Sequence, residues 1–181
     1  MIKHIYPLDS VLISQMFGSN SGFYSDPKYG GIKGHNGIDF YTGHGTPVYA
    51  CHDGRAEYQV DPSGGHGVVI TSEDKTYKTI YWHLCDPIEE PEFKSPIADK
   101  SKDLEMGDII GYADNTGAST GDHLHFGMKF IKNGETINKD NGYLGSVDPL
   151  PYFDNNYPVT VRLLTKKISW LQLLISMFMK K

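Results

Sequence analysis

The chain has 181 residues, of which 39% are hydrophobic, and its formal net charge at pH 7 is −5. This length and apolar content suffice for one hydrophobic core, and the absence of internal repeats argues against a second folded domain. The acidic balance provides no basic surface of the kind that binds phosphate backbones, so nucleic acid is not an expected partner.

Short alternating apolar segments, separated by turn signals, predict an all-β fold. Twenty glycines and ten prolines supply the turns between such segments. Strands are expected at residues 46–50, 67–71 and 76–83.

Three further segments concentrate histidine in patterns that suit metal binding. They read HNGID at residues 35–39, YWHL at 81–84 and HLHFG at 123–127. In an extended strand, side chains at i, i+2 and i+4 share one face, so His35 can lie beside Asp39. The same rule places His123 beside His125. Two neighbouring strands carrying these pairs could close around one metal ion.

The order of these motifs resembles the lysostaphin/LytM family of zinc endopeptidases, which cut the peptide cross-links of bacterial peptidoglycan. The resemblance covers residues 14–153, most of the chain. It also includes the segments QMFG, GTPVYA, DGRA, GVVI, MGDIIG, TGASTG and VDP. It implies a β-sandwich-like peptidase domain with an open groove lined by strands.

The resemblance further implies that His35, Asp39 and His125 bind Zn²⁺, while His83 and His123 face the substrate without binding the metal. Two neutral imidazoles and one carboxylate leave zinc positively charged, which lowers the pKa of bound water toward about 7 and polarises a peptide carbonyl. His83 and His123 are then the catalytic pair that moves protons, because imidazole titrates near neutrality. Either of the two could be the general base.

We expect two variable loops to form the sides of the groove and to determine substrate preference. They are residues 19–34 and 86–103. The first lacks the arginine that many family members carry shortly after their Phe-Gly pair. It carries Phe23, Tyr24 and Tyr29, which would either line the substrate groove or pack down against the loop.

The remaining histidines and the two cysteines are expected to have no part in the chemistry. Solvent-exposed or turn positions are expected for His4, His44, His52 and His66. Cys51 and Cys85 are predicted to be small buried residues in a reducing compartment. Cys85 shares strand parity with His83 and is expected near the metal, but not as a ligand.

The N-terminal residues lack the apolar stretch of a secretory signal, and no segment approaches about 18 uninterrupted apolar residues. Because the implied substrate lies outside the cytoplasm, we expect a protein made in the cytoplasm that reaches the cell wall after lysis-type release. A bacteriophage endolysin or a virion-associated hydrolase fits this description. A bacterial enzyme with a non-standard export route is the alternative.

The sequence divides into a peptidase domain at residues 1–157 and a basic amphipathic C-terminal tail at residues 158–181. Five basic residues and no acidic residue follow Asp154, whereas the rest has twelve basic and 22 acidic residues, a net charge of −10. Residues 168–179 predict a helix with one narrow polar stripe. Such a helix either docks on the domain or on a second copy, or binds an anionic membrane.

Three functional classes follow from the motifs. An active zinc endopeptidase is favoured, because all the implied ligands and both additional histidines are present. A non-catalytic LytM-like protein that binds cell wall or activates another hydrolase is the second class, and a virion structural protein is the third. Glycyl-glycine bridges and D-alanyl-diaminopimelate links are both candidate substrates, since loop shape decides between them.

Overall fold

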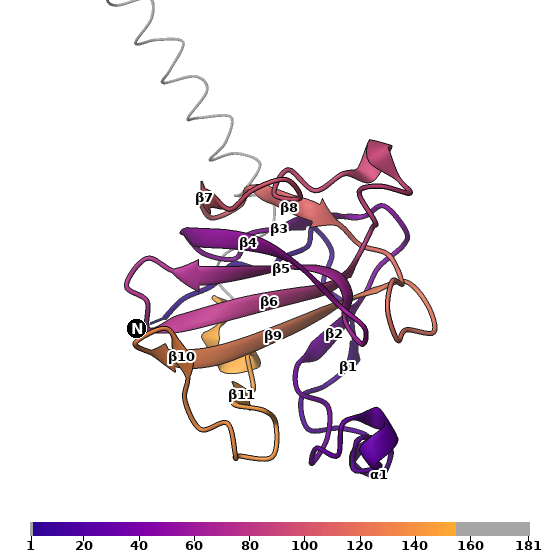
Figure 1. Cartoon of the computed structure of the whole chain (residues 1–181), viewed down its shortest axis with the longest axis vertical. Helices are drawn as coiled ribbons and strands as arrows, with labels where there is room; N and C mark the ends of the chain where they lie inside the picture. The colour runs from indigo at the N-terminus through magenta and orange to yellow at the C-terminus, as the bar shows by residue number, and fades with distance from the viewer. Residues whose placement is uncertain (1, 155–181) are drawn as a thin grey trace, which may run out of the picture.

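The computed structural model describes residues 2–154, which form an antiparallel β fold (Figure 1). The strands are β1 (Ile13–Gln15), β2 (Ile38–Tyr41), β3 (Pro47–Tyr49), β4 (Gly54–Asp61), β5 (Gly65–Ser72), β6 (Tyr77–Leu84), β7 (Lys102–Leu104), β8 (Ile109–Tyr112), β9 (His123–Lys132), β10 (Glu135–Thr136) and β11 (Ser146–Val147). Helical turns are limited to α1 (Ser21–Tyr24), η1 (Pro27–Tyr29), η2 (Pro91–Phe93) and η3 (Leu150–Tyr152) in the described part of the chain. The predicted all-β class is confirmed.

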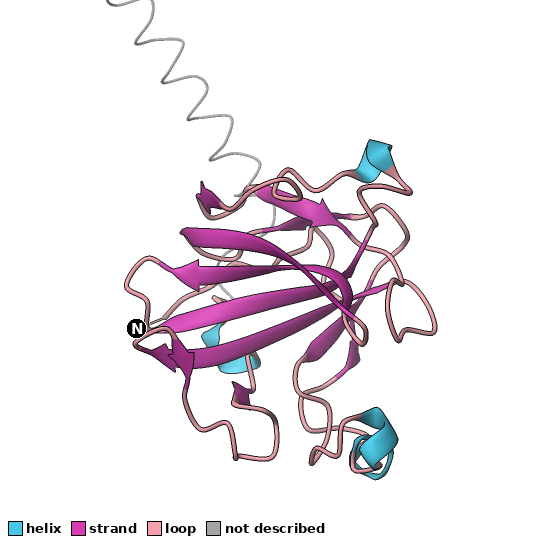
Figure 2. Ribbon diagram, in the orientation of Figure 1, coloured by secondary structure: helices cyan, strands magenta, loops and turns pink. Residues whose placement is uncertain are grey.

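Nine strands form the main sheet, in the order β1-β2-β9-β6-β5-β4-β7, with β10 and β11 also pairing with β9. Strands β3 and β8 form a separate two-stranded sheet (Figure 2). Val48 of β3 and Ile110 of β8 belong to one buried cluster with Phe40, Ile70 and Phe126 of the main sheet. The core therefore lies between the two sheets, as expected for a sandwich-like fold. The strands predicted at residues 46–50, 67–71 and 76–83 correspond to β3, β5 and β6.

The central pair, β2 and β9, has one apolar and one polar face. The side chains that are completely buried on the inner face are Ile38, Phe40, Leu124 and Phe126. Asp39 pairs with His125 and Tyr41 pairs with His123 in the antiparallel register. Because successive side chains in a strand alternate between faces, Asp39, His123 and His125 share the opposite, outer face.

The N-terminal segment is held in place by main-chain hydrogen bonds to the last described residues. The His4 N–H donates to the Tyr152 carbonyl at 2.8 Å, and the Asp154 N–H donates to the His4 carbonyl at 2.8 Å. This pairing buries His4 completely, and His52 is 5% exposed. The prediction of solvent or turn positions is therefore wrong for both, because contacts between the two ends of the domain decide their burial.

The other two histidines of that group differ from each other. His44 is exposed and lies in a turn, as predicted. His66 is half-buried and lies in β5, so the prediction of a turn there is wrong. The glycines around it allow close packing and do not end the strand.

The predicted domain boundary at residue 157 and the predicted helix at residues 168–179 lie outside the described residues. Within residues 2–154, no helix is long and apolar enough to cross a membrane.

Packing of the inner face of the main sheet can be tested at Ile70, which is completely buried in β5. Ile70→Ala should lower the free energy of unfolding by about 2–5 kcal/mol, because it removes buried methyl groups and leaves a cavity. Val60→Ala in neighbouring β4 is the control, since Val60 is 65% exposed. That change should cost less than about 1 kcal/mol. Urea unfolding followed by tryptophan fluorescence gives both values, and equal losses would contradict the described core.

Candidate metal centre

Three side chains converge on the outer face of the main sheet. His35 Nε2 lies 2.9 Å from His125 Nδ1 and 3.1 Å from Asp39 Oδ1. The third distance, from His125 Nδ1 to Asp39 Oδ1, is 3.0 Å. The three atoms thus form a nearly equilateral triangle, and their side chains are at most 13% exposed.

The triangle fits a zinc ion in both spacing and chemistry. In a tetrahedral site with zinc–nitrogen bonds of 2.0–2.1 Å, neighbouring ligand atoms lie about 3.3–3.4 Å apart. The observed distances of 2.9–3.1 Å are close to this spacing. Two imidazole nitrogens and one carboxylate oxygen are also a donor set that zinc prefers, and they leave one position of a tetrahedron open.

His35 reaches the triangle from a loop and not from the strand that carries Asp39. Strand β2 begins at Ile38, so the prediction that His35 and Asp39 share a strand face is wrong. The loop is held instead by main-chain bonds: the Gly18 N–H donates to the His35 carbonyl at 2.8 Å, and the His35 N–H donates to the Ser19 carbonyl at 2.9 Å. These bonds place the imidazole next to Asp39 all the same.

The ring of His35 is fixed by a hydrogen bond on its far side. Its Nδ1–H donates to the carbonyl oxygen of Met16 at 3.2 Å. This bond selects the tautomer in which the Nε2 lone pair faces Asp39 and His125. A second nitrogen bound to a main-chain carbonyl is the usual arrangement of a metal-binding histidine.

Gly37 allows the loop to pass directly against His125. A methyl group at this position would lie 2.6 Å from the Phe126 carbonyl oxygen and 2.7 Å from His125 Nε2. Both distances are shorter than van der Waals contact. The glycine in the HNGID segment is therefore required for close approach, and it lets His35 and His125 come together.

His83 is the extra residue of a β-bulge at the end of β6. Its neighbours Trp82 and Leu84 pair with consecutive residues of β5, so His83 has no partner in that strand. Its φ of 64° lies in the left-handed region, which is unusual for histidine. Regular alternation would place His83 on the inner face with Tyr81. The bulge instead brings its ring to 4.5 Å from that of His123, centroid to centroid.

Main-chain carbonyls orient both additional histidines. The His83 Nδ1–H donates to the Thr116 carbonyl at 2.6 Å, and the His123 Nδ1–H donates to the Gly121 carbonyl at 2.8 Å. Each ring therefore keeps its Nε2 lone pair available. His123 Nε2 lies 3.7 Å from Asp39 Oδ1, outside hydrogen-bond distance but directly beside the triangle.

The electrostatics of the centre keep Asp39 ionised and keep His83 and His125 neutral. Burial opposes ionisation of Asp39, but the influence of the neighbouring His125 and His35 outweighs it and holds the pKa of that carboxyl well below its usual range. Burial lowers the pKa of His83 to about 4, partly offset by its bond to Thr116. Burial also lowers the pKa of His125, against the influence of Asp39. Neutral imidazoles and an ionised carboxylate are the forms that bind metal.

The aromatic residues of the first variable loop behave differently from one another. The Tyr24 ring stacks on His35, with centroids 5.5 Å apart, and its hydroxyl accepts a hydrogen bond from Gln15 Nε2 at 2.9 Å. Phe23 is 52% exposed. Tyr24 therefore borders the candidate centre, whereas Phe23 faces solvent.

Cys85 is buried and not disulfide-bonded, as predicted, and so is Cys51. Cys85 does not belong to the triangle of ligand atoms, and its expected place near the metal stays a prediction. The Cys85 thiol donates to the Ala113 carbonyl at 3.6 Å. Its sulfur groups with ligand atoms of other residues, namely His44, Glu90 and Asp114.

Sequence reasoning missed the groups that orient the rings. The acceptors are the main-chain carbonyl oxygens of Met16, Thr116 and Gly121. Any residue type has such an oxygen, so the amino-acid sequence does not indicate which carbonyls orient the rings. The turn composition of TGASTG at residues 116–121 was the one available hint, because glycine-rich turns often place main-chain groups against a site.

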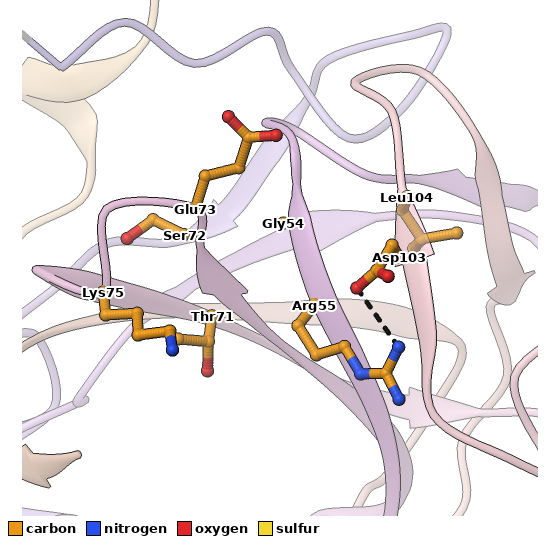
Figure 3. Close-up of a pocket in the computed structure, with 8 residues that line it drawn as sticks. All are labelled: Gly54, Arg55, Thr71, Ser72, Glu73, Lys75, Asp103 and Leu104. Atoms are coloured by element: carbon orange, nitrogen blue, oxygen red, sulfur yellow. Dashed lines mark hydrogen bonds and ion pairs between the residues drawn. The ribbon is translucent and has the colours of Figure 1, made fainter.

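A shallow hollow of about 270 Å³ lies where the C-terminal end of β5 pairs with the start of β4 (Figure 3). Arg55 and Asp103 form an ion pair of 3.2 Å there between exposed side chains. Its lining contains neither histidine nor cysteine and consists of Gly54, Arg55, Thr71, Ser72, Glu73, Lys75, Asp103 and Leu104. This hollow is separate from the candidate metal centre.

Comparison with known proteins gives a consistent result. The family model described as peptidase family M23 matches residues 33–139. The peptidoglycan DD-endopeptidase ShyB of Vibrio cholerae is 35% identical over 122 residues, covering 67% of this chain and 26% of that protein. The glycyl-glycine endopeptidase ALE-1 of Staphylococcus capitis is 35% identical over 100 residues, covering 53% of this chain and 25% of that protein. The chain spans about a quarter of the length of the curated relatives it matches.

Among solved structures, the chain resembles a zinc-containing peptidase from Vibrio cholerae. The TM-score is 0.58 at 28% sequence identity, and the match covers 82% of this chain and 39% of that chain. The family model's match at residues 33–139 includes β2 and β9, the strands that carry Asp39 and His125.

The close approach at Gly37 gives a direct test of the centre. Gly37→Ala should displace His125 from Asp39, because the added methyl group would overlap the imidazole and the Phe126 carbonyl. Zinc affinity should fall by about 10–100-fold, the usual cost of disturbing the support of a metal ligand. Competition with a chromogenic chelator measures it.

The control is Gly22→Ala in α1, where an added methyl group would meet no atom within 4 Å. Its zinc affinity should equal that of the unaltered protein. If Gly37→Ala bound zinc as tightly as the control, the proposed role of this glycine would be refuted.

Proposed function

This chain belongs to peptidase family M23, and we propose that it is a zinc-dependent endopeptidase that hydrolyses peptide cross-links of bacterial peptidoglycan. The observation that carries the proposal is the triangle of His35 Nε2, Asp39 Oδ1 and His125 Nδ1, with two further oriented imidazoles beside it. A metal alone would explain the triangle. The two additional imidazoles are what a proton-transfer reaction needs.

The geometry of the triangle supports the proposed roles of its three residues. His35, Asp39 and His125 would hold zinc, which when bound polarises a peptide carbonyl and makes water a better nucleophile near neutral pH. Asp39 contributes the one negative charge of the set, so the site keeps a net positive charge. The Met16 carbonyl holds the His35 ring so that Nε2 points inward.

The roles of His83 and His123 follow from their tautomers. Each has its Nδ1–H committed to a main-chain carbonyl, so each presents a basic Nε2 on the outer face. Such a nitrogen can accept the proton of an attacking water, and once protonated it can donate to a developing oxyanion or to the leaving amine. Hydrolysis needs both kinds of transfer, and two adjacent imidazoles supply them as a pair.

The substrate class rests on the relatives. One relative named above is a peptidoglycan DD-endopeptidase and another is a glycyl-glycine endopeptidase, so the bonds for which they are named differ. We therefore propose a cross-link peptide of either type as the substrate. Action on the cell wall after phage-type lysis stays a prediction from the sequence.

A second candidate is a non-catalytic cell-wall-binding or hydrolase-activating protein. It would require loss of a ligand or of a proton-transfer group. The described residues contain all five side chains in orientations suited to catalysis, which favours the enzyme.

Metal removal tests the proposal most simply. The full chain should carry about one zinc ion in the outer-face centre and should release soluble peptides from purified peptidoglycan. Two cell-wall types, one with glycine bridges and one with direct diaminopimelate links, should be digested in parallel, and mass spectrometry of the fragments identifies the bond. A chelator should stop release, and re-addition of zinc should restore it.

Asp39→Ala and His125→Ala should abolish both zinc binding at this centre and release. Ile70→Val, a conservative change in the core away from the centre, serves as the matched control. Release by the chelated protein, or by Asp39→Ala, would show that the hydrolysis does not depend on this centre. No release from either cell wall by the zinc-loaded protein would favour the non-catalytic candidate.

His83→Ala and His123→Ala should separate catalysis from metal binding. Neither imidazole belongs to the triangle, so both variants should retain zinc in the centre. Turnover should fall by about 10²–10⁴, the usual range for loss of an acid-base group. Metal analysis and peptide release, measured on the same preparations, show whether each histidine acts in catalysis or in metal binding. Loss of zinc would make that histidine a ligand, and unchanged turnover would remove it from the mechanism.

A further inference from the structure

A second group of potential metal ligands lies on the inner side of the main sheet, away from the outer-face centre. His4, Cys51 and His52 each offer one ligand atom, and the three atoms lie within 4.8 Å of one another. All three residues are buried, with exposed fractions of 0%, 0% and 5%. They adjoin inward-facing residues of β6, because His52 Nε2 bonds to the Thr79 hydroxyl at 2.9 Å. The proposed peptidase chemistry uses none of them.

The clearest sign of a ligand is the state of His4. Both of its ring nitrogens are buried, and neither has a hydrogen-bond partner among residues 2–154. Its contacts are with other rings: it stacks on His52 at 5.1 Å and lies 5.3 Å from Tyr77. A phenylalanine would make the same contacts without burying two unpaired nitrogens, and buried polar groups are normally paired. The unpaired nitrogens of His4 therefore indicate that the imidazole binds a ligand at this position.

His52 already has the orientation of a metal-binding histidine. Its Nδ1–H donates to the Asp53 carbonyl at 2.8 Å, so the lone pair is on Nε2. That nitrogen faces the cluster and accepts from the Thr79 hydroxyl. The same use of a carbonyl to fix the tautomer is seen at His35, and it is typical of metal ligands.

Cys51 is placed to become a thiolate when a cation is present. The Tyr81 hydroxyl donates to its sulfur at 3.0 Å, which stabilises negative charge there. Cys51 is completely buried, and as a thiol it carries one proton. Binding of a divalent metal would displace that proton, as it does at other cysteine sites.

We propose that His4, Cys51 and His52 bind a second, structural metal ion that fastens the N-terminal segment to the core. Two imidazoles and one thiolate suit Zn²⁺ or Co²⁺, and they do not suit Mg²⁺ or Ca²⁺. The ligand atoms must approach one another by roughly 1 Å to reach tetrahedral spacing. Because the site is enclosed, the metal enters as the chain folds. This site is independent of the peptidase function proposed above.

Cobalt distinguishes the two sites, because a cobalt–thiolate bond gives an intense near-ultraviolet charge-transfer band that nitrogen and oxygen ligands do not give. The full chain with Asp39→Ala and His125→Ala, which lacks the outer-face centre, would be unfolded with chelator and reductant. After chelator removal it would be refolded with Co²⁺ under reducing conditions. We expect about one cobalt ion per chain and the thiolate band.

In the same background, His4→Phe and Cys51→Ser should each remove the band. Each should weaken cobalt binding by more than the roughly 10–100-fold that loss of an outer-shell partner costs. Cys85→Ser is the matched control and should keep the band, since Cys85 groups with other residues. In the presence of chelator, the melting temperature of His4→Phe should equal or exceed that of its parent, because a phenyl ring buries no unpaired nitrogen.

Absence of the band in the refolded parent would overturn the proposal. So would a band that survives His4→Phe or Cys51→Ser, or one that disappears with Cys85→Ser. A chelator-treated His4→Phe protein that melts well below its parent would show that the nitrogens of His4 have protein partners, and would also contradict it.

Discussion

The antiparallel register between β2 and β9 determines both the hydrophobic core and the candidate metal centre. It pairs Asp39 with His125, so that a carboxylate and an imidazole stand side by side on the outer face. The same register places Phe40 and Phe126 on the inner face, where they are completely buried. A shift of the β2–β9 register by one residue would exchange the two faces, which would disrupt the hydrophobic core and the metal centre together. The apolar packing that stabilises the sheet therefore also fixes the chemistry on its other side.

Main-chain hydrogen bonds position the histidines that the strand pairing alone does not place. The bulge that carries His83 would be strained by itself, since a φ of 64° is unfavourable for histidine. It is held by main-chain bonds, including one from the His83 N–H to the Gly64 carbonyl at 2.9 Å. The carbonyls of Met16, Thr116 and Gly121 then select the tautomers of three rings. Main-chain groups of the protein itself thus fix the orientation of the three imidazoles.

The sequence predicted the parts of the site that follow from period-two alternation. Asp39, His123 and His125 lie in regular strands, so their common face could be inferred from spacing. His35 and His83 could not be placed this way, because one lies in a loop and the other in a bulge. Strand spacing, which the structure does not have there, and the resemblance to a known family both grouped His35 with Asp39. The grouping of His83 rested on the resemblance alone. His4 and His52 were misjudged because their burial comes from pairing between the two ends of the domain, which local pattern does not show.

We propose that a zinc ion occupies the triangle of His35, Asp39 and His125. An anomalous difference map from a zinc-loaded crystal of the full chain, recorded on both sides of the zinc absorption edge, tests this directly. A peak is expected about 2.0–2.2 Å from His35 Nε2, Asp39 Oδ1 and His125 Nδ1. A map from zinc-loaded crystals with no peak at these three atoms would contradict it.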